Sequence, residues 1–155
     1  MAKKARKAPP VIKNRRAAFR FELLDTFECG MALWGSEVQS LRRGQGSLEE
    51  AYAHLKGGEI WLRGMHIAPY EHGQVHSHEP TRARKLLLHK REIDKLGPKL
   101  TQRGLTLVPL KVYFNDRGLA KLTLALARGK THRDKRQDLQ KRDAKREMDR
   151  AMRRR

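Results

Sequence analysis

The sequence contains little of what secreted and membrane proteins require. Its 155 residues include a single cysteine, Cys29, so no disulfide can form within the chain, as is typical of a reducing compartment. No apolar run approaches the roughly 20 residues of a membrane-spanning helix, and the opening MAKKARKAPP lacks the apolar segment of a signal peptide. We therefore expect a cytoplasmic protein with no membrane partner.

Motifs that carry enzymatic chemistry are also missing from the sequence. There is no glycine-rich phosphate loop followed by Lys-Ser or Lys-Thr, no Gly-x-Ser-x-Gly elbow and no Cys-x-x-Cys pair. Cys29 has no identifiable partner, and the adjacent Glu49 and Glu50 would point to opposite faces of a strand. The sequence predicts a protein that is not an enzyme and needs no cofactor.

Positive charge is what the chain has in excess. Lys and Arg number 36 against 17 acidic residues, a net charge of +19, and nucleic acid is the commonest partner of such a basic surface. Residues 1–16 and 129–155 each carry +7, whereas residues 17–128 carry only +5. We expect a disordered arm over residues 1–13, a folded domain over 14–129, and a tail over 130–155 that is disordered alone and helical on RNA.

Alternating apolar residues predict about six strands, with connections too short for a parallel sheet. The strands are expected near residues 19–23, 31–34, 52–54, 60–62, 105–114 and 119–127. Gly30 is expected to form a turn between the first two strands, and Gly57-Gly58 and residues 115–118 should form hairpin turns. Pro109 implies an edge strand or a bulge.

Two helices are expected between the strands. One spans about residues 35–44, where Ser36 and Gln39 fit a capping box. The other spans His89–Gly104 and should be kinked or split at Gly97-Pro98. The expected fold class is therefore mainly β with helices, a small antiparallel β-barrel with two inserted helices and a basic C-terminal tail.

Longer motifs in a fixed order are more specific than charge or period. They are Asn14 to Ala17 (NRRA), Phe27 to Gly30 (FECG), Gly35 to Arg42 (GSEVQSLR), Tyr52, His66 to Tyr70 (HIAPY), Arg82 to Glu92 (RARKLLLHKRE), Gly104 to Leu110 (GLTLVPL), Ala127 to Lys130 (ARGK) and Asp134 to Arg136 (DKR). Over residues 13–155 the chain resembles the SmpB family, the bacterial SsrA-binding proteins.

The resemblance implies a role in ribosome rescue by trans-translation. Proteins of this family bind the tRNA-like domain of transfer-messenger RNA and deliver it, with elongation factor Tu, to ribosomes stalled on truncated messages. Their barrel is related to the oligonucleotide-binding type, which agrees with the strands expected here. The tail is implied to be helical on the ribosome, and we expect a monomer whose partners are this RNA, the small-subunit decoding centre with its mRNA channel, and the elongation factor.

The resemblance also implies two sets of contact residues. The RNA-binding set from the family pattern is Glu28, Tyr52, Leu87 and Lys121. Further phosphate contacts are expected from Arg84, Lys85, Lys90 and Arg91. The tail set, expected at the decoding centre and mRNA channel, is Gly129, Lys130, His132, Arg133, Asp134, Lys135 and Arg136. The family commonly has a ring immediately before the Asp-Lys-Arg motif; here Arg133 stands there and His132 one earlier, and either can stack on a base.

Each of these residues also has a purely structural interpretation. Tyr52 can be an aromatic at the edge of the core, Leu87 a core residue and Glu28 a solvated carboxylate at a strand end. A general RNA chaperone or a structural ribosomal protein would share the charge and the basic tails, so this class remains the alternative function.

A third candidate function rests on a stretch rich in histidine. Residues 69–80 show no period and are expected to form a loop, in which Glu71–Glu79 holds three His and two carboxylates that could bind zinc. A metal-dependent nuclease is conceivable on such a loop. Because Gly73 and the lack of period do not favour an organised site, we expect no metal.

Overall fold

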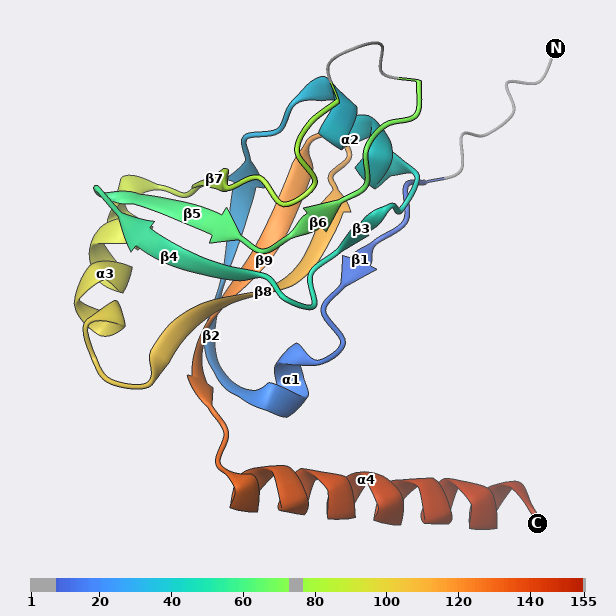
Figure 1. Ribbon diagram of the computed structural model, residues 1–155. Coiled ribbons are helices and arrows are strands. Elements are labelled where there is room, and N and C mark those ends of the chain that lie inside the picture. Colours follow the sequence, from blue (N-terminus) through green and yellow to red (C-terminus); the bar gives the residue numbers. More distant parts are fainter. Residues whose placement is uncertain (1–7, 73–76, 155) are drawn as a thin grey trace, which may run out of the picture.

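Strands close on themselves in the structure of this chain. The computed structural model describes residues 8–72 and 77–154 (Figure 1). Its elements are β1 (Ile12–Lys13), α1 (Ala17–Arg20), β2 (Phe21–Met31), α2 (Gly35–Arg42), β3 (Gly46–Ser47), β4 (Tyr52–Lys56), β5 (Glu59–Arg63), β6 (His66–Ile67), β7 (Arg84–Leu87), α3 (Lys90–Leu100), β8 (Leu105–Phe114), β9 (Ala120–Gly129) and α4 (His132–Arg153).

The main sheet is antiparallel and has the order β1-β8-β4-β5-β7-β2-β9. Because β8 pairs with β4 and also with β9, the strands from β8 through β4, β5, β7 and β2 to β9 form a closed ring. In a closed sheet, the strands that would otherwise be at the two edges pair with each other, so their backbone N–H and C=O groups find partners. The expected fold class, a mainly β protein with an antiparallel closed sheet and added helices, is confirmed.

The two hairpins expected from turn residues are present. Gly57 and Gly58 join β4 to β5 with φ of +60° and +74°, the left-handed conformation that a two-residue hairpin turn requires. Strands β8 and β9 pair along almost their whole length, with a register shift between Pro109 and Lys111. The bulge expected at Pro109 is confirmed, because proline has no amide hydrogen to donate to the ladder.

Strand β2 differs most from expectation. Gly30 forms no turn; it lies inside an unbroken strand of 11 residues, paired with Leu87 on one side and Lys121 on the other. A bulge between Leu23 and Asp25 shifts the register of β2 against β9, which interrupts the apolar alternation. The predicted strand over residues 19–23 also begins late, at Phe21, because the preceding residues form the short helix α1.

Both inserted helices form, with different ends from those expected. The prediction of a capping box by Ser36 and Gln39 is wrong. Helix α2 begins after Trp34, whose backbone N–H donates to the Glu37 carboxylate at 2.8 Å. Ser36 forms a hydrogen bond with the ring of His78 instead. Helix α3 ends at Leu100 rather than residue 104 and is not split at Gly97-Pro98. Pro98 lies in the last turn of α3, so the hydrogen bond that its missing N–H would donate is lost only near the end of the helix.

The apolar core fills the inside of the ring. Helices α2 and α3 lie outside the ring at two different places (Figure 1). Leu41 from α2 and Leu96 from α3 are fully buried, as are Ile60, Leu62 and Leu122 from the strands. Burial of each such side chain contributes about 1.5–3 kcal/mol relative to exposure. This core fixes the strands whose outer faces form the surface described below.

The two ends of the chain are arranged differently. Residues 12 and 13 pair with Val112 and Lys111 of β8 as β1, so the disordered arm expected through residue 13 does not include them. Helix α4 extends beside the barrel at the end opposite α2 (Figure 1), and none of its described side chains is buried. Its disorder in the absence of RNA stays a prediction. No helix within residues 8–72 and 77–154 combines the length and the apolar character needed to cross a membrane.

Candidate nucleic-acid interface

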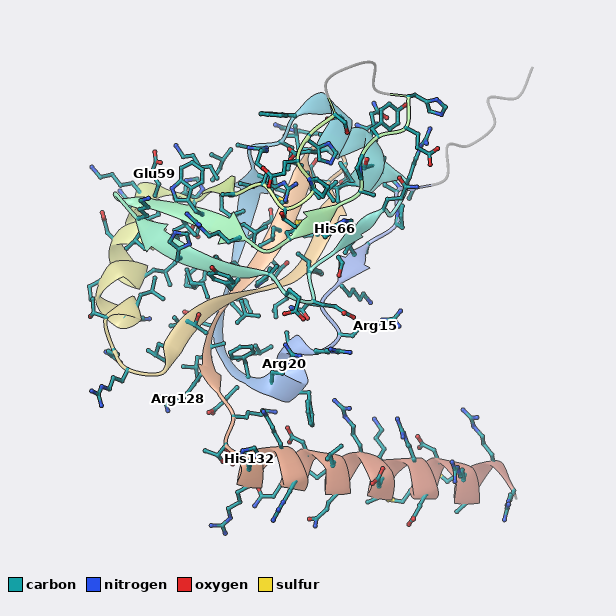
Figure 2. All side chains as sticks on the ribbon, in the orientation of Figure 1. Arg15, Arg20, Glu59, His66, Arg128 and His132 are labelled. Carbon is teal, nitrogen blue, oxygen red and sulfur yellow. The ribbon has the colours of Figure 1, made fainter. Side chains whose placement is uncertain are left out.

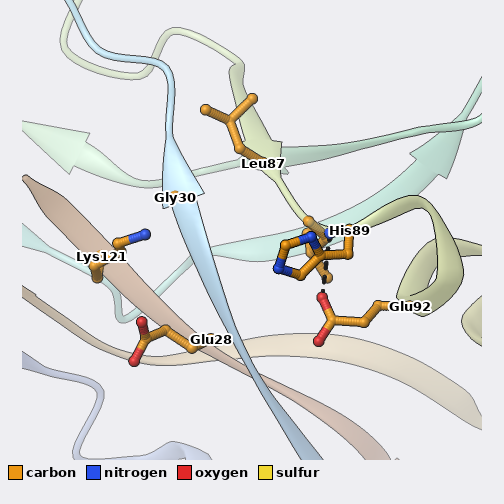
Figure 3. Close-up of a pocket in the computed structure, with 7 residues that line it drawn as sticks. Glu28, Gly30, Leu87, His89, Glu92 and Lys121 are labelled. Carbon is orange, nitrogen blue, oxygen red and sulfur yellow. Dashed lines mark hydrogen bonds between the residues drawn. The ribbon is translucent and has the colours of Figure 1, made fainter.

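A cavity of about 500 Å³ opens where β9, β2 and β7 lie side by side next to the start of α3 (Figure 3). We call it the β2 pocket. Its lining residues are Glu28, Gly30, Leu87, Leu88, His89, Glu92 and Lys121. It contains three of the four residues that the family pattern assigns to RNA binding.

Strand pairing explains why residues so far apart in sequence meet in the β2 pocket. Gly30 of β2 is the register partner of Leu87 in β7 and of Lys121 in β9. Glu28 lies two residues earlier on β2, and residues two apart on a strand share one face of the sheet. Glu28, Leu87 and Lys121 therefore converge on the outer face of the barrel.

Gly30 lines the β2 pocket without a side chain that would fill it. A Cβ atom at this position would lie 3.3 Å from the Cβ of Leu87, closer than ordinary van der Waals contact. The Leu87 side chain is 51% exposed, so its interpretation as a core residue is wrong. An exposed leucine beside an open glycine floor offers an apolar surface to a flat ligand such as a ribose or a base.

Glu28 is held by a residue that the sequence interpretation missed. The hydroxyl of Tyr113 on β8 donates a hydrogen bond to the Glu28 carboxylate. This hydrogen bond, with burial and the negative charge of Glu28, raises the pKa of Tyr113 to about 12. The phenol therefore stays protonated as a donor at neutral pH. Tyr113 pairs with Lys121 in the β8–β9 ladder, and the expected hairpin register was the signal that could have found it.

The charge of the β2 pocket is mixed. It contains two carboxylates, Glu28 and Glu92, and one cation, Lys121; Glu92 also accepts a hydrogen bond from the His89 backbone N–H at 3.3 Å (Figure 3). Two carboxylates disfavour a bare phosphate but can accept hydrogen bonds from base amino groups or 2′-hydroxyls. The pocket is therefore suited to a nucleoside, with Lys121 available for a neighbouring phosphate.

The cations at the rim of the pocket lie on β7 and at the start of α3. Lys90 and Arg91 are exposed in the first turn of α3. Lys85 is half-exposed and forms an ion pair with Glu59 of the adjacent β5 at 2.7 Å. The phosphate contacts expected of these three side chains stay predictions.

Arg84, expected to contact phosphate, does not belong to this surface. Its guanidinium is fully buried and donates to the Glu37 carboxylate at 2.8 Å, to the Met65 carbonyl at 2.8 Å and to the Pro80 carbonyl at 3.1 Å. All three guanidinium nitrogens are used inside the protein. The prediction of an RNA contact by Arg84 is wrong, because alternation along β7 turns it inward while Lys85 faces outward.

Helix α4 begins with a capped turn and is joined to the barrel by Lys130. The Thr131 hydroxyl accepts from the Asp134 backbone N–H at 3.3 Å, and the Asp134 carboxylate accepts from the Thr131 hydroxyl at 2.7 Å. The Thr131 hydroxyl and the Thr131 backbone N–H both donate to the Asp134 carboxylate and lower its pKa. Lys130 donates to the Ala18 carbonyl at 2.8 Å and forms an ion pair with Asp138.

The other tail residues are open to solvent. His132, Arg133 and Arg136 are exposed and Lys135 is half-buried. Gly129 ends β9, where a Cβ atom would meet no other described atom within 4 Å. Figure 2 shows side chains projecting from both sides of α4, and the labelled Arg15, Arg20 and Arg128 on the side of the barrel toward α4. The contacts of the tail set with the ribosome stay predictions.

Comparison with known proteins decides the family. The model of the SmpB protein family matches residues 11–154. The chain belongs to the SmpB family. It is 52% identical over 145 residues to the SsrA-binding protein of Desulforamulus reducens, with 94% of this chain and 90% of that protein covered. It is 54% identical over 154 residues to the SsrA-binding protein of Mycobacterium sp. (strain KMS), with 99% and 91% covered.

A solved structure supports the same assignment. A chain described as "tmRNA-SmpB: a journey to the center of the bacterial ribosome" is 52% identical and superposes with a TM-score of 0.67, covering 79% of this chain and 86% of that chain. The family resemblance stated from the motifs is confirmed.

Of the four residues that the SmpB family pattern assigns to RNA binding, Tyr52 is the one that does not line the β2 pocket. It begins β4, opposite Arg63 of β5, and is 50% exposed. In the closed ring β4 and β2 are not neighbours: β5 and β7 separate them on one side, β8 and β9 on the other. A role for Tyr52 in RNA binding therefore requires a second point of contact and stays a prediction.

Cys29 and the histidine stretch have structural roles where the structure describes them. Cys29 is buried and its thiol donates to the Leu122 carbonyl at 3.3 Å. Burial raises the pKa of this thiol to about 12, so it is no nucleophile at neutral pH.

His78 is buried between Ser36 and the Ile67 carbonyl, at 2.9 Å from each. Among the described residues no group of three metal-ligating side chains lies together; residues 73–76 of the loop lie outside them.

Proposed function

We propose that this chain binds the tRNA-like domain of transfer-messenger RNA and delivers it to stalled ribosomes for trans-translation. The observation that supports this most directly is the convergence of Glu28, Leu87 and Lys121 in the β2 pocket, in a chain whose relatives are SsrA-binding proteins. The protein acts in the cytoplasm as a monomer, by binding rather than catalysis.

Recognition combines two kinds of contact. In the β2 pocket, Glu28 accepts from a base amino group or a 2′-hydroxyl, while Leu87 packs on the ring or ribose beneath it. Tyr113 orients Glu28 for this contact. At the rim, Lys85, Lys90 and Arg91 neutralise phosphates. The pocket supplies selectivity and the rim supplies affinity that depends on salt.

The tail has a separate task in this proposal. With elongation factor Tu, the RNA complex enters the ribosome, and α4 then occupies the empty mRNA channel. Arg133 and His132 are adjacent on α4, about 100° apart around the helix axis, so only one of them can stack on a given decoding nucleotide. Gly129 and the capped turn after it set the direction in which α4 leaves the barrel.

A gel shift with competitors tests the proposal. The wild-type chain should prefer a transcript of the tRNA-like domain over ordinary tRNA at physiological salt. Lys121→Ala should weaken binding to that transcript, whereas Lys56→Ala, which removes an equal charge at the β4–β5 turn, should change it far less. Equal affinity for both RNAs would instead identify a general RNA binder, as expected of an RNA chaperone or a structural ribosomal protein.

A further inference from the structure

Trp34 lies exposed just beyond the end of β2, the strand that carries Glu28 and Gly30 of the β2 pocket. The side chain is 55% exposed, although tryptophan carries a large apolar surface. Beyond β2, Trp34 has extended backbone angles, and the Ala32 N–H donates to the Lys85 carbonyl at 3.0 Å, which continues the pairing of β2 with β7. Glu28, Gly30 and Trp34 are separated by even numbers of residues, so alternation places them along one outer face.

One face of the Trp34 ring is covered by a fixed cation. The Arg82 guanidinium lies 4.5 Å from the ring centroid. It is held by two hydrogen bonds to Glu37, from Nε at 3.1 Å and from the terminal nitrogen at 2.7 Å. The same carboxylate accepts the Trp34 backbone N–H, so Glu37 positions both the ring and the cation.

Glu37 is itself rigidly held. It is fully buried and also paired with Arg84, so three groups position a single carboxylate. Burial alone would raise its pKa, but the hydrogen bonds from Arg82 and the Trp34 N–H, with the charge of Arg84, hold it below the ordinary value. The carboxylate stays ionised, and the guanidinium beside the ring is held by two hydrogen bonds to it.

The helix end does not require an indole at this position. The Trp34 side chain makes no capping hydrogen bond to α2; the cap uses the Glu37 carboxylate and the Trp34 backbone, which any residue but proline provides. A partner is therefore the better explanation for an exposed ring with one face backed by a guanidinium. In a chain of net charge +19, that partner is a nucleic-acid base, because bases stack on aromatic and guanidinium planes.

We propose that Trp34, backed by Arg82, is a stacking platform for one unpaired base of the RNA whose neighbouring segment occupies the β2 pocket. The proposal deepens the proposed function and rests on it. It assigns a sequence-tolerant contact to the platform and leaves selectivity to the pocket, because every base has a stackable face.

Tryptophan fluorescence provides a direct measurement. The chain has two tryptophans, Trp34 and Trp61, so the variant Trp61→Phe reports on Trp34 alone. Titration with the tRNA-like-domain transcript, and separately with an oligoadenylate, should quench this fluorescence as a base stacks. Heparin carries negative charge but no bases and should bind without comparable quenching. Equal quenching by heparin, or none by either RNA, would overturn the platform.

Affinity measurements separate stacking from charge. Trp34→Leu should weaken transcript binding about 5- to 150-fold, the usual loss for one stacked base, and Trp34→Phe should recover most of it. Because no phosphate contact is removed, the slope of log Kd against log salt should not change. Leu119→Ser, at an equally exposed apolar residue after the β8–β9 turn, is the matched control and should have no effect.

The outcomes distinguish the platform from the proposed function. If Lys121→Ala weakens binding while Trp34→Leu does not, the platform is refuted and the proposed function stands. If wild type fails to prefer the transcript over tRNA but oligoadenylate still quenches Trp34 and Trp34→Leu still weakens binding, the proposed function is refuted and the stacking contact stands. Circular dichroism of each variant excludes loss of fold as the cause.

Discussion

Replacement of Glu37 by glutamine should destabilise the fold far more than the same replacement at Glu59. Both carboxylates are paired with a basic side chain, at 2.8 Å from Arg84 and 2.7 Å from Lys85, so the two ion pairs have nearly equal geometry. They differ in burial: Glu37 and Arg84 are fully buried, whereas the side chains of Lys85 and Glu59 are 39% and 43% exposed. Glu37 also pairs with Arg82 and accepts the Trp34 backbone N–H, so the comparison sets a buried carboxylate with several partners against a half-exposed carboxylate with one.

The expected magnitude follows from the groups left behind. Glu37→Gln keeps the volume but leaves Arg84 buried without a counter-charge, which costs about 3–5 kcal/mol. In the exposed pair, Glu59→Gln leaves Lys85 free to reach water, and such pairs contribute about 0–1 kcal/mol. With a urea m-value of about 2 kcal/mol/M, Glu37→Gln should lower the unfolding midpoint by roughly 1.5–2.5 M.

Urea unfolding followed by circular dichroism measures both losses. The double variant Glu37→Leu with Arg84→Met should recover part of the stability lost in the single variant, because no buried charge is left unpaired. Recovery is incomplete because the Met65 and Pro80 carbonyls lose their donor. Equal midpoints for Glu37→Gln and Glu59→Gln would refute the reasoning. So would a double variant less stable than Glu37→Gln.

The stability that Glu37 contributes should depend on pH in a defined direction. The pKa of Glu37 in the folded state lies below its ordinary value of 4.5, so the unfolded chain binds this proton more readily. The stabilisation from Glu37 is therefore present above pH 4.5 and is lost as the pH falls through the lower, folded-state pKa. The stability difference between wild type and Glu37→Gln should shrink on acidification, because a protonated glutamate resembles glutamine.

Two further predictions concern the pocket and the tail. Tyr113→Phe removes the hydrogen bond that orients Glu28, a net loss of about 0.5–1.5 kcal/mol, and should weaken transcript binding several-fold in a gel shift; unchanged binding would show that Glu28 needs no orienting partner. Deletion of residues 130–155 should leave affinity for isolated transfer-messenger RNA nearly unchanged at physiological salt but abolish tagging of stalled peptides. A collapse of RNA affinity instead would show that α4 belongs to the RNA-binding surface.

Several structural elements of this protein could be predicted from short stretches of sequence. The Gly57-Gly58 turn, the long β8–β9 hairpin and the bulge at Pro109 follow from conformational preferences of a few adjacent residues, which hold whatever surrounds them. The same is true of the charge division and of the motifs that indicated the SmpB family. They are properties of the chain order alone.

Tertiary pairing decided the rest. Gly30 looked like a turn residue, yet it lies inside β2 because it pairs with Leu87 of β7 and Lys121 of β9. Tyr113 and Glu28, 85 residues apart, meet only because β8 and β2 flank β9.

Arg84 and Lys85 illustrate the division between sequence and structure most clearly. Both belong to one basic run, and both were expected to meet phosphate. Alternation along a strand requires that they face opposite sides, but which side is the interior depends on Glu37, 47 residues away. The sequence by itself determined that the protein is basic, mainly β and of the SmpB family. Only the folded structure decided which cations are held inside by a buried carboxylate and which remain at the surface for RNA.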